Sequence, residues 1–149
     1  MKKSKYYIFF SVKRNNMEKI LGKTYESNIF TVLCNNNNCF YEKDVIEFTR
    51  KVGNKFRFTL TAYEYSDKAG KKLKKKYNGN GVIILNEDGS FVLDSVYSNS
   101  PKGKSLTQRG LGDFGRNYDS MHIDLTKTEL NNKWKAVVCQ GTPCFKIKN

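Results

Sequence analysis

Proline, histidine and tryptophan are scarce in this sequence of 149 residues, with 2, 1 and 1 copies respectively. Long apolar runs are missing too, and no stretch approaches the roughly 18 apolar residues that a membrane-spanning helix needs. No segment has the pattern of a long amphipathic helix, and no Asn-x-Ser/Thr sequon is present. With 13% aromatic residues and so little proline, the composition is not that of a disordered tail. These absences favour one folded domain that is not glycosylated.

Acidic residues are also few, 14 against 27 basic ones, so the formal net charge is +13. Such an excess favours anionic partners, namely a nucleic acid, an anionic membrane surface or an acidic protein. The alternative is a background composition rich in lysine and asparagine, without a dedicated basic surface.

The N-terminus has a charged start, Met1–Lys5, and an apolar run of only seven residues, Tyr6–Val12. No small-x-small cleavage motif follows this run, which argues against a signal peptide. We therefore expect residues 1–16 to be a leader or a disordered segment, followed by one β domain over residues 17–149. We also expect an intracellular protein, with secretion as the alternative.

The clearest strand signal is Phe56–Tyr65, in which Phe56, Phe58 and Leu60 alternate with polar residues. A period of two predicts a long antiparallel strand with one face on a core. Met17–Leu21 predicts one helical turn that ends at Gly22, and turns are expected at Gly53-Asn54, Asn78–Gly81 and Asn86–Gly89. Further strands are expected at Thr24–Leu33, Val45–Val52, Val82–Leu85, Phe91–Tyr97, Met121–Leu125, Trp134–Cys139 and Phe145–Ile147.

Seven to eight short strands joined by turns predict an all-β fold, an antiparallel barrel or sandwich with a short N-terminal helix. Gly22-Lys23-Thr24-Tyr25, together with the chain length and the strand number, resembles the lipocalin-like barrels and their early Gly-x-Trp motif. This resemblance implies a barrel that holds a small apolar ligand. No binding residue is carried over from the family.

The strongest electrostatic feature is a lysine run flanked by tyrosines, at Lys68, Lys71, Lys72, Lys74, Lys75 and Lys76. Each lysine that neutralises a phosphate releases counterions, and tyrosines on an exposed face can stack on bases. The run therefore predicts polyanion binding. The alternative is a solvated loop that keeps the protein soluble.

Ser98–Ser120 interrupts the strand pattern and is expected to be a long functional or disordered loop. Within it, Gly110–Gly115 spells G-x-G-x-x-G, but the flanking residues fit neither a kinase nor a dinucleotide-binding fold. A milder interpretation is a glycine loop that wraps a phosphate, with a plain mobile loop as the alternative. Its cationic candidates are Lys102, Lys104, Arg109 and Arg116.

His122 is the only histidine, and Asp124 has the same strand parity. A histidine beside carboxylates and cations suits general acid–base chemistry in a small nuclease or toxin-like enzyme. The alternative is that His122 is an ordinary solvent-facing strand residue. We favour a protein that is not an enzyme over one that is.

The cysteines form two matched pairs, Cys34–Cys39 and Cys139–Cys144, each with four residues between. Two disulfides, a four-thiolate zinc site and free thiols all remain open. We expect no cofactor, with zinc as the alternative. Three functions follow from the sequence: a cationic binding protein for a nucleic acid or an acidic partner, a lipocalin-like barrel for a small apolar ligand, and a nuclease that uses His122.

Overall fold

The structure is a computed structural model, and it describes residues 17–35, 38–97, 106–130, 133–136 and 144–148. One short 3-10 helix precedes the strands. The elements are η2 (Met17–Ile20), β1 (Thr24–Ser27), β2 (Phe30–Asn35), β3 (Asn38–Val52), β4 (Lys55–Tyr65), β5 (Leu73–Leu85), β6 (Ser90–Tyr97), β7 (Leu106–Phe114), β8 (Ser120–Leu130), β9 (Lys133–Ala136) and β10 (Cys144–Ile147).

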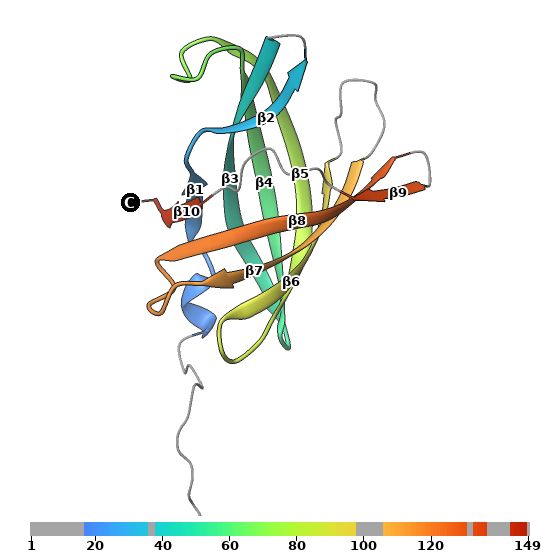
Figure 1. Cartoon of the computed structure of the whole chain (residues 1–149). Helices are drawn as coiled ribbons and strands as arrows, with labels where there is room; N and C mark the ends of the chain where they lie inside the picture. Colours follow the sequence, from blue (N-terminus) through green and yellow to red (C-terminus); the bar gives the residue numbers. More distant parts are fainter. Residues whose placement is uncertain (1–16, 36–37, 98–105, 131–132, 137–143, 149) are drawn as a thin grey trace, which may run out of the picture.

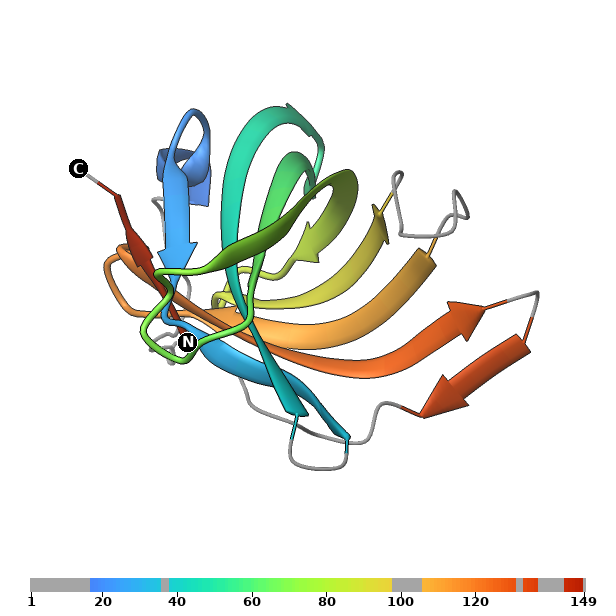
Figure 2. The same cartoon turned by 90° about the horizontal axis from the view of Figure 1, so that it is seen from above.

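Eight of the strands close into an antiparallel barrel in the order β1-β10-β8-β7-β6-β5-β4-β3, and β3 returns to β1 (Figures 1 and 2). Closure is made by β1, because Tyr25 is in register with Ile147 of β10 on one side and with Ile46 of β3 on the other. β2 and β9 lie outside this ring, paired with β3 and β8. The predicted all-β antiparallel barrel is confirmed. Within the described ranges, no helix has the length and apolar character needed to cross a membrane.

The strand β4 is the best-predicted element of the barrel. Phe56, Phe58, Leu60 and Ala62 are buried in strict alternation with more exposed residues. The strand pairs with β3 and β5 along most of its length, so it lies inside the sheet as expected. The turns at Gly53-Asn54 and Asn86–Gly89 are also confirmed, with positive φ at Gly53 and Gly89.

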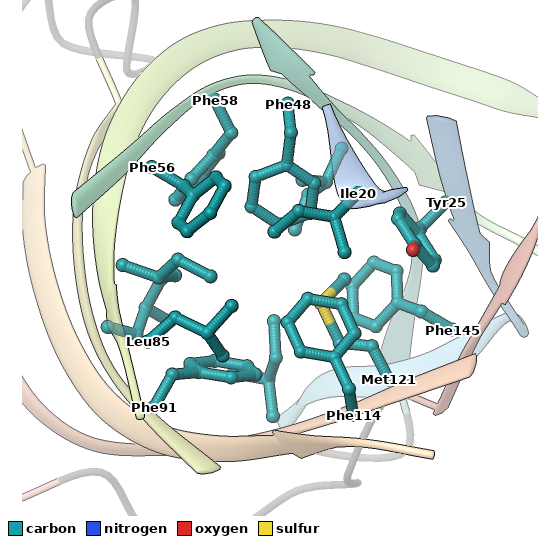
Figure 3. Close-up of a cluster of buried hydrophobic side chains, with 14 of the residues drawn as sticks. Ile20, Tyr25, Phe48, Phe56, Phe58, Leu85, Phe91, Phe114, Met121 and Phe145 are labelled. Carbon is teal, nitrogen blue, oxygen red and sulfur yellow. The ribbon is translucent and has the colours of Figure 1, made fainter. Parts of the chain in front are cut away.

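Aromatic side chains fill one end of the barrel, the end that carries η2 and the β3–β4 and β5–β6 turns (Figures 1 and 3). We call it the η2 end. Phe48 and Phe58 meet edge to face with ring centroids 5.8 Å apart, and Phe91 and Phe114 lie 5.3 Å apart. The Tyr25 hydroxyl donates a hydrogen bond to the Tyr118 carbonyl oxygen. Together these packed rings close this end of the barrel.

Several strand boundaries differ from those predicted. The expected strand Thr24–Leu33 divides at residues 28 and 29 into β1 and β2, because β1 must pair with β10 to close the barrel. The expected turn at Asn78–Gly81 is wrong, since these residues lie within β5. Gly79 and Gly81 pair there with Leu60 and Phe58. Strand pairing along the full length of β4 overrides the local turn preference of the Asn-Gly sequence.

The predicted loop Ser98–Ser120 is also wrong over residues 106–114, whereas residues 115–119 do form a turn. Residues 106–114 form β7, so Gly110 and Gly112 are strand residues and do not form a phosphate loop. A Cβ at Gly112 would overlap the Phe91 ring, and one at Gly110 would overlap the β8 backbone. These glycines allow close packing between strands, which explains why the sequence looks like a loop.

Candidate functional site

The connection between β4 and β5, residues 66–72, carries half of the lysine run and has a defined shape. The Asp67 carboxylate accepts hydrogen bonds from the backbone N–H groups of Lys71 (3.0 Å) and Lys72 (2.6 Å). The bond from the Lys71 amide, followed by that from Lys72, lowers the pKa of Asp67. Gly70 has φ +73°, and a Cβ there would overlap the Ile29 side chain. Local hydrogen bonds therefore hold this connection, which we call the lysine loop.

The other half of the run begins β5 and is not part of a loop. All six predicted lysines, Lys68, Lys71, Lys72, Lys74, Lys75 and Lys76, are exposed. Strand alternation places Lys74 and Lys76 on the outer surface of the barrel, whereas Lys75 has the inward parity. Lys76 pairs with Tyr63, and its Nζ atom lies 5.8 Å from the centre of the Tyr63 ring.

The outer surface of β3, β4 and β5 contains further cations that the sequence analysis did not select. Lys43 pairs with Tyr63 on the side away from Lys76, and its Nζ atom lies 2.9 Å from Glu26. Arg50 and Arg57 face each other directly across β3 and β4, and both are exposed. Like charges in this position repel each other. We call the set Lys43, Arg50, Arg57, Tyr63, Lys74 and Lys76 the basic outer face.

Of the predicted cations of Ser98–Ser120, the two described ones, Arg109 and Arg116, do not join this surface. Arg109 lies on β7, separated from β5 by β6, and its Nε atom is 3.9 Å from the Asp94 carboxylate. Arg116 is exposed in the turn between β7 and β8. Lys102 and Lys104 lie outside the described residues. In the structure, the six lysines of the run therefore lie in one region, whereas Arg109 lies apart from them on β7.

A different group of charged side chains has the inward strand parity: Glu42 and Asp44 of β3 and Glu64 of β4. Asp44 continues the alternation of the buried residues Ile46 and Phe48, and Glu64 continues that of Leu60 and Ala62. Register pairs Glu42 with Glu64, and Asp44 with Ala62. These carboxyl groups lie towards the end of the barrel that carries the lysine loop, which we call the loop end.

Asp44 is the deepest of the three, with only 7% of its surface exposed. Its backbone N–H donates to the Ser27 hydroxyl at 2.8 Å. Its Oδ1 atom has no hydrogen-bond partner within the described part of the chain. Glu42 and Glu64 are half-buried. The group thus extends from a partly exposed rim to one buried oxygen atom that lacks a donor.

Burial raises the pKa of Asp44 well above its usual value, and the nearby charge of Glu42 raises it further. Burial also raises the pKa of Glu42, while a hydrogen bond with Asp44 partly opposes this rise. Such a bond between two carboxyl groups needs one proton between them. The pair therefore holds a proton at a pH at which exposed carboxyl groups have lost theirs.

Tyr77 of β5 completes this inner group. Its hydroxyl donates a hydrogen bond of 3.1 Å to Oε1 of Glu64. Burial, followed by the bond and charge of Glu64, raises the pKa of Tyr77 to about 12. We call Glu42, Asp44, Glu64 and Tyr77 the inner acidic group. None of the three carboxylates was predicted from the sequence, although strand parity continued from Phe48 and Leu60 would have indicated them. Tyr77 was expected among the exposed tyrosines beside the lysine run, but its parity on β5 is inward.

His122 lies on the outer surface, with 46% of its side chain exposed. It pairs with Asp113 on β7, and its Nδ1 atom is 3.9 Å from Oδ1 of Asp113. On its other side it pairs with Cys144 of β10. The predicted partner, Asp124, is exposed two residues along β8. Barrel closure brings Asp113, His122 and Cys144 into one row, while catalysis by His122 stays a prediction.

The two cysteine pairs have different described states. Cys34 and Cys39 are in register at the end of the β2–β3 hairpin, and Cys39 is disulfide-bonded. Cys144 is an exposed free thiol, and Cys139 lies outside the described residues. No group of three or more histidine, cysteine or acidic residues in the described ranges is arranged to hold a metal ion. A zinc site at the cysteines stays a prediction.

These features define a class by geometry alone: a closed antiparallel barrel with an aromatic end, a carboxylate-lined end and a basic outer face. No protein-family model, curated protein or solved structure matches this chain. Its function therefore has to be argued from its own residues.

Proposed function

We propose that this protein binds a polyanion, specifically a single-stranded nucleic acid, through the lysine loop and the basic outer face. One observation carries the proposal: Tyr63 lies between Lys43 and Lys76 on adjacent strands, next to a loop of exposed lysines. A tyrosine ring between cations offers a base a stacking partner and its phosphates counter-charges at the same time.

The facing pair Arg50 and Arg57 supports the same proposal. Two guanidinium groups on directly paired residues repel each other in the free protein. A phosphate between them removes the repulsion and accepts hydrogen bonds from both. The net charge of +13 adds long-range attraction for any polyanion. An acidic protein partner would use the same cations but would gain less from Tyr63.

The two other functions are less well supported. A lipocalin-like barrel for an apolar ligand has the closed barrel in its favour, but buried Asp44 makes the loop end a poor apolar environment. A nuclease that uses His122 has the neighbouring Asp113 in its favour, on an exposed outer surface.

The test compares two triple variants that remove equal charge. Lys71, Lys74 and Lys76 are replaced by glutamine in one, and the exposed Lys127, Lys146 and Lys148 in the other. Binding of labelled oligo(dT) is measured by anisotropy as a function of salt. The first variant is expected to lower the slope of log K against log salt by about 2, because each phosphate contact to a single strand contributes about 0.7.

Equal losses in both variants would show that net charge alone drives binding, and no binding by the native protein at low salt would refute the proposal. Tyr63→Ala separates nucleic acid from other polyanions. It is expected to weaken oligo(dT) binding by about 1–3 kcal/mol, the usual contribution of one stacked base, and to leave heparin binding unchanged. An equal loss for heparin would contradict stacking.

A further inference from the structure

The inner acidic group contains a polar atom whose burial the fold itself does not explain. A buried acceptor without a donor costs stability, and native proteins pair nearly all such atoms. Oδ1 of Asp44 has no partner within the described residues, and Asp44 is buried, with only 7% of its surface exposed. Glu42 and Glu64 add like charges beside it. Strongly perturbed groups in such surroundings are typical of binding and catalytic sites.

We propose that the loop end of the barrel interior binds a small organic amine as its ammonium cation, with Asp44 and Glu42 accepting its N–H groups. The inference does not depend on the basic outer face. An ammonium group supplies both the positive charge and the donors that this group of acceptors lacks.

Access to Asp44 is consistent with a small ligand. Glu42, Glu64 and Tyr77 are half-buried, so solvent reaches the rim of the group. The β4 residue in register with Asp44 is the small Ala62, whose partner on β5 is Tyr77. The next inward position of β5 towards the η2 end is the small residue Gly79. The bond from Tyr77 fixes Glu64 at the rim.

The charged groups around Asp44 come from three strands. β3 contributes Glu42, β4 contributes Glu64, and β5 contributes Tyr77 and, opposite Glu64 at the rim, the exposed Lys75. β1 contributes only the Ser27 hydroxyl. On these strands, Lys75 is therefore the one described cation that has the inward parity at the rim. It pairs in register with Glu64, which lies two positions along β4 from Ala62, the residue paired with Asp44.

A metal ion is a poorer occupant than an amine. No three acidic, histidine or cysteine side chains in the described ranges have an arrangement that could hold a metal. An ammonium group needs only two or three acceptors, and an attached carbon skeleton suits the apolar residues Ile46 and Leu60 below the carboxyl groups.

Binding of the cation should expel a proton. Glu42 and Asp44 share a hydrogen bond and therefore a proton. An ammonium ion that donates to both oxygen atoms takes the place of this proton, which passes to the buffer. Amine binding therefore weakens as the pH falls and the carboxyl groups compete for protons.

The experiment is calorimetric titration of the full chain with benzylamine, and with benzyl alcohol as its neutral analogue, in two buffers of different ionisation enthalpy. We expect benzylamine to bind with proton release and benzyl alcohol to bind at least about tenfold more weakly. Asp44→Asn and Glu42→Gln should each weaken benzylamine binding about tenfold or more. Glu47→Gln, an exposed position on the outer surface of the same strand, is the control and should bind normally.

Several results would overturn the proposal. These are no heat of binding with benzylamine, equal binding of benzyl alcohol, or native affinity in both Asp44→Asn and Glu42→Gln. Displacement of benzylamine by calcium chloride at equal ionic strength would show a metal site instead. Native circular dichroism of each variant confirms that a loss of binding is not a loss of fold.

Discussion

The two ends of the barrel are built on the same strands but with opposite chemistry. At the η2 end, the inward positions of β3 and β4 are Phe48, Phe56 and Phe58, all buried. Towards the loop end, the inward positions of the same strands are Asp44, Glu42 and Glu64. The rings gain free energy from burial, whereas the carboxyl groups lose solvation by it.

This difference separates residues that hold the fold from residues that need another explanation. Removing a ring at the η2 end takes away packing that nothing else supplies. Removing a charge at the loop end relieves a cost. The comparison therefore predicts mutational effects of opposite sign at inward positions on neighbouring strands.

The largest effect is expected at the η2 end. Phe58→Ala should lower the free energy of unfolding by about 3–5 kcal/mol, as truncation of a core aromatic residue does. Phe58 is 2% exposed and packs against Phe48. Urea denaturation measures the loss. Arg57→Ala on the outer surface is the control, and it should change stability by less than about 0.5 kcal/mol. Equal effects of the two changes would mean that the inward parity is wrong.

An effect of opposite sign is expected at the loop end. Asp44→Asn should raise the free energy of unfolding at neutral pH by about 1.4 kcal/mol for each unit by which the pKa of Asp44 is raised, because a neutral amide has no charged form that burial and Glu42 disfavour. The folded-state pKa values of Asp44 and Glu42 are raised, so the folded state holds extra protons above the unfolded value of about 4.

The pH dependence follows from the same shifts. The contribution of these two carboxyl groups to the stability of the native protein is greatest below the unfolded pKa and falls as the pH rises through the folded pKa values. Asp44→Asn should reduce this fall. Thermal unfolding across this pH range measures it, with Glu47→Gln as control. If Asp44→Asn is less stable than the native protein at neutral pH, the effects at the two ends of the barrel do not have opposite signs, and the comparison fails.

The smallest effect is expected on the outer surface, away from both ends. His122→Ala should change stability by less than about 0.5 kcal/mol, because the side chain is 46% exposed. The same variant tests the nuclease hypothesis through hydrolysis of single-stranded DNA or RNA. If the native protein cleaves either substrate and the variant does not, His122 is catalytic and the binding proposal alone is incomplete.

Local sequence pattern predicted the parts of the fold that depend on local rules. The alternation of Phe56–Tyr65 correctly gave the inward residues of β4, and Gly53 and Gly89 marked real turns. The prediction failed where a distant partner decides the conformation. Gly112 looks like a loop residue, but it is a strand residue that leaves space for the Phe91 ring. That ring belongs to another strand, so no local pattern reveals the reason.

The candidate sites show the same division. The exposed lysines of Lys68–Lys76 followed from charge alone. Glu42 and Asp44 were missed because the expected strand began at Val45, one residue after Asp44, although β3 begins at Asn38. Glu64 lies inside the expected strand Phe56–Tyr65, where its inward parity would have indicated it. The position of His122 beside Cys144 depends on the pairing of β8 with β10, which only barrel closure sets.

The most direct test of the account is the titration of the Asp44 carboxyl carbon by NMR, with and without benzylamine. We predict a midpoint clearly above the ordinary aspartate value of about 3.9, and a lower midpoint when benzylamine is present. A midpoint near the ordinary value would mean that Asp44 is solvated and carries no unusual cost. A raised midpoint that benzylamine leaves unchanged would contradict the amine site while keeping the contrast between the two ends.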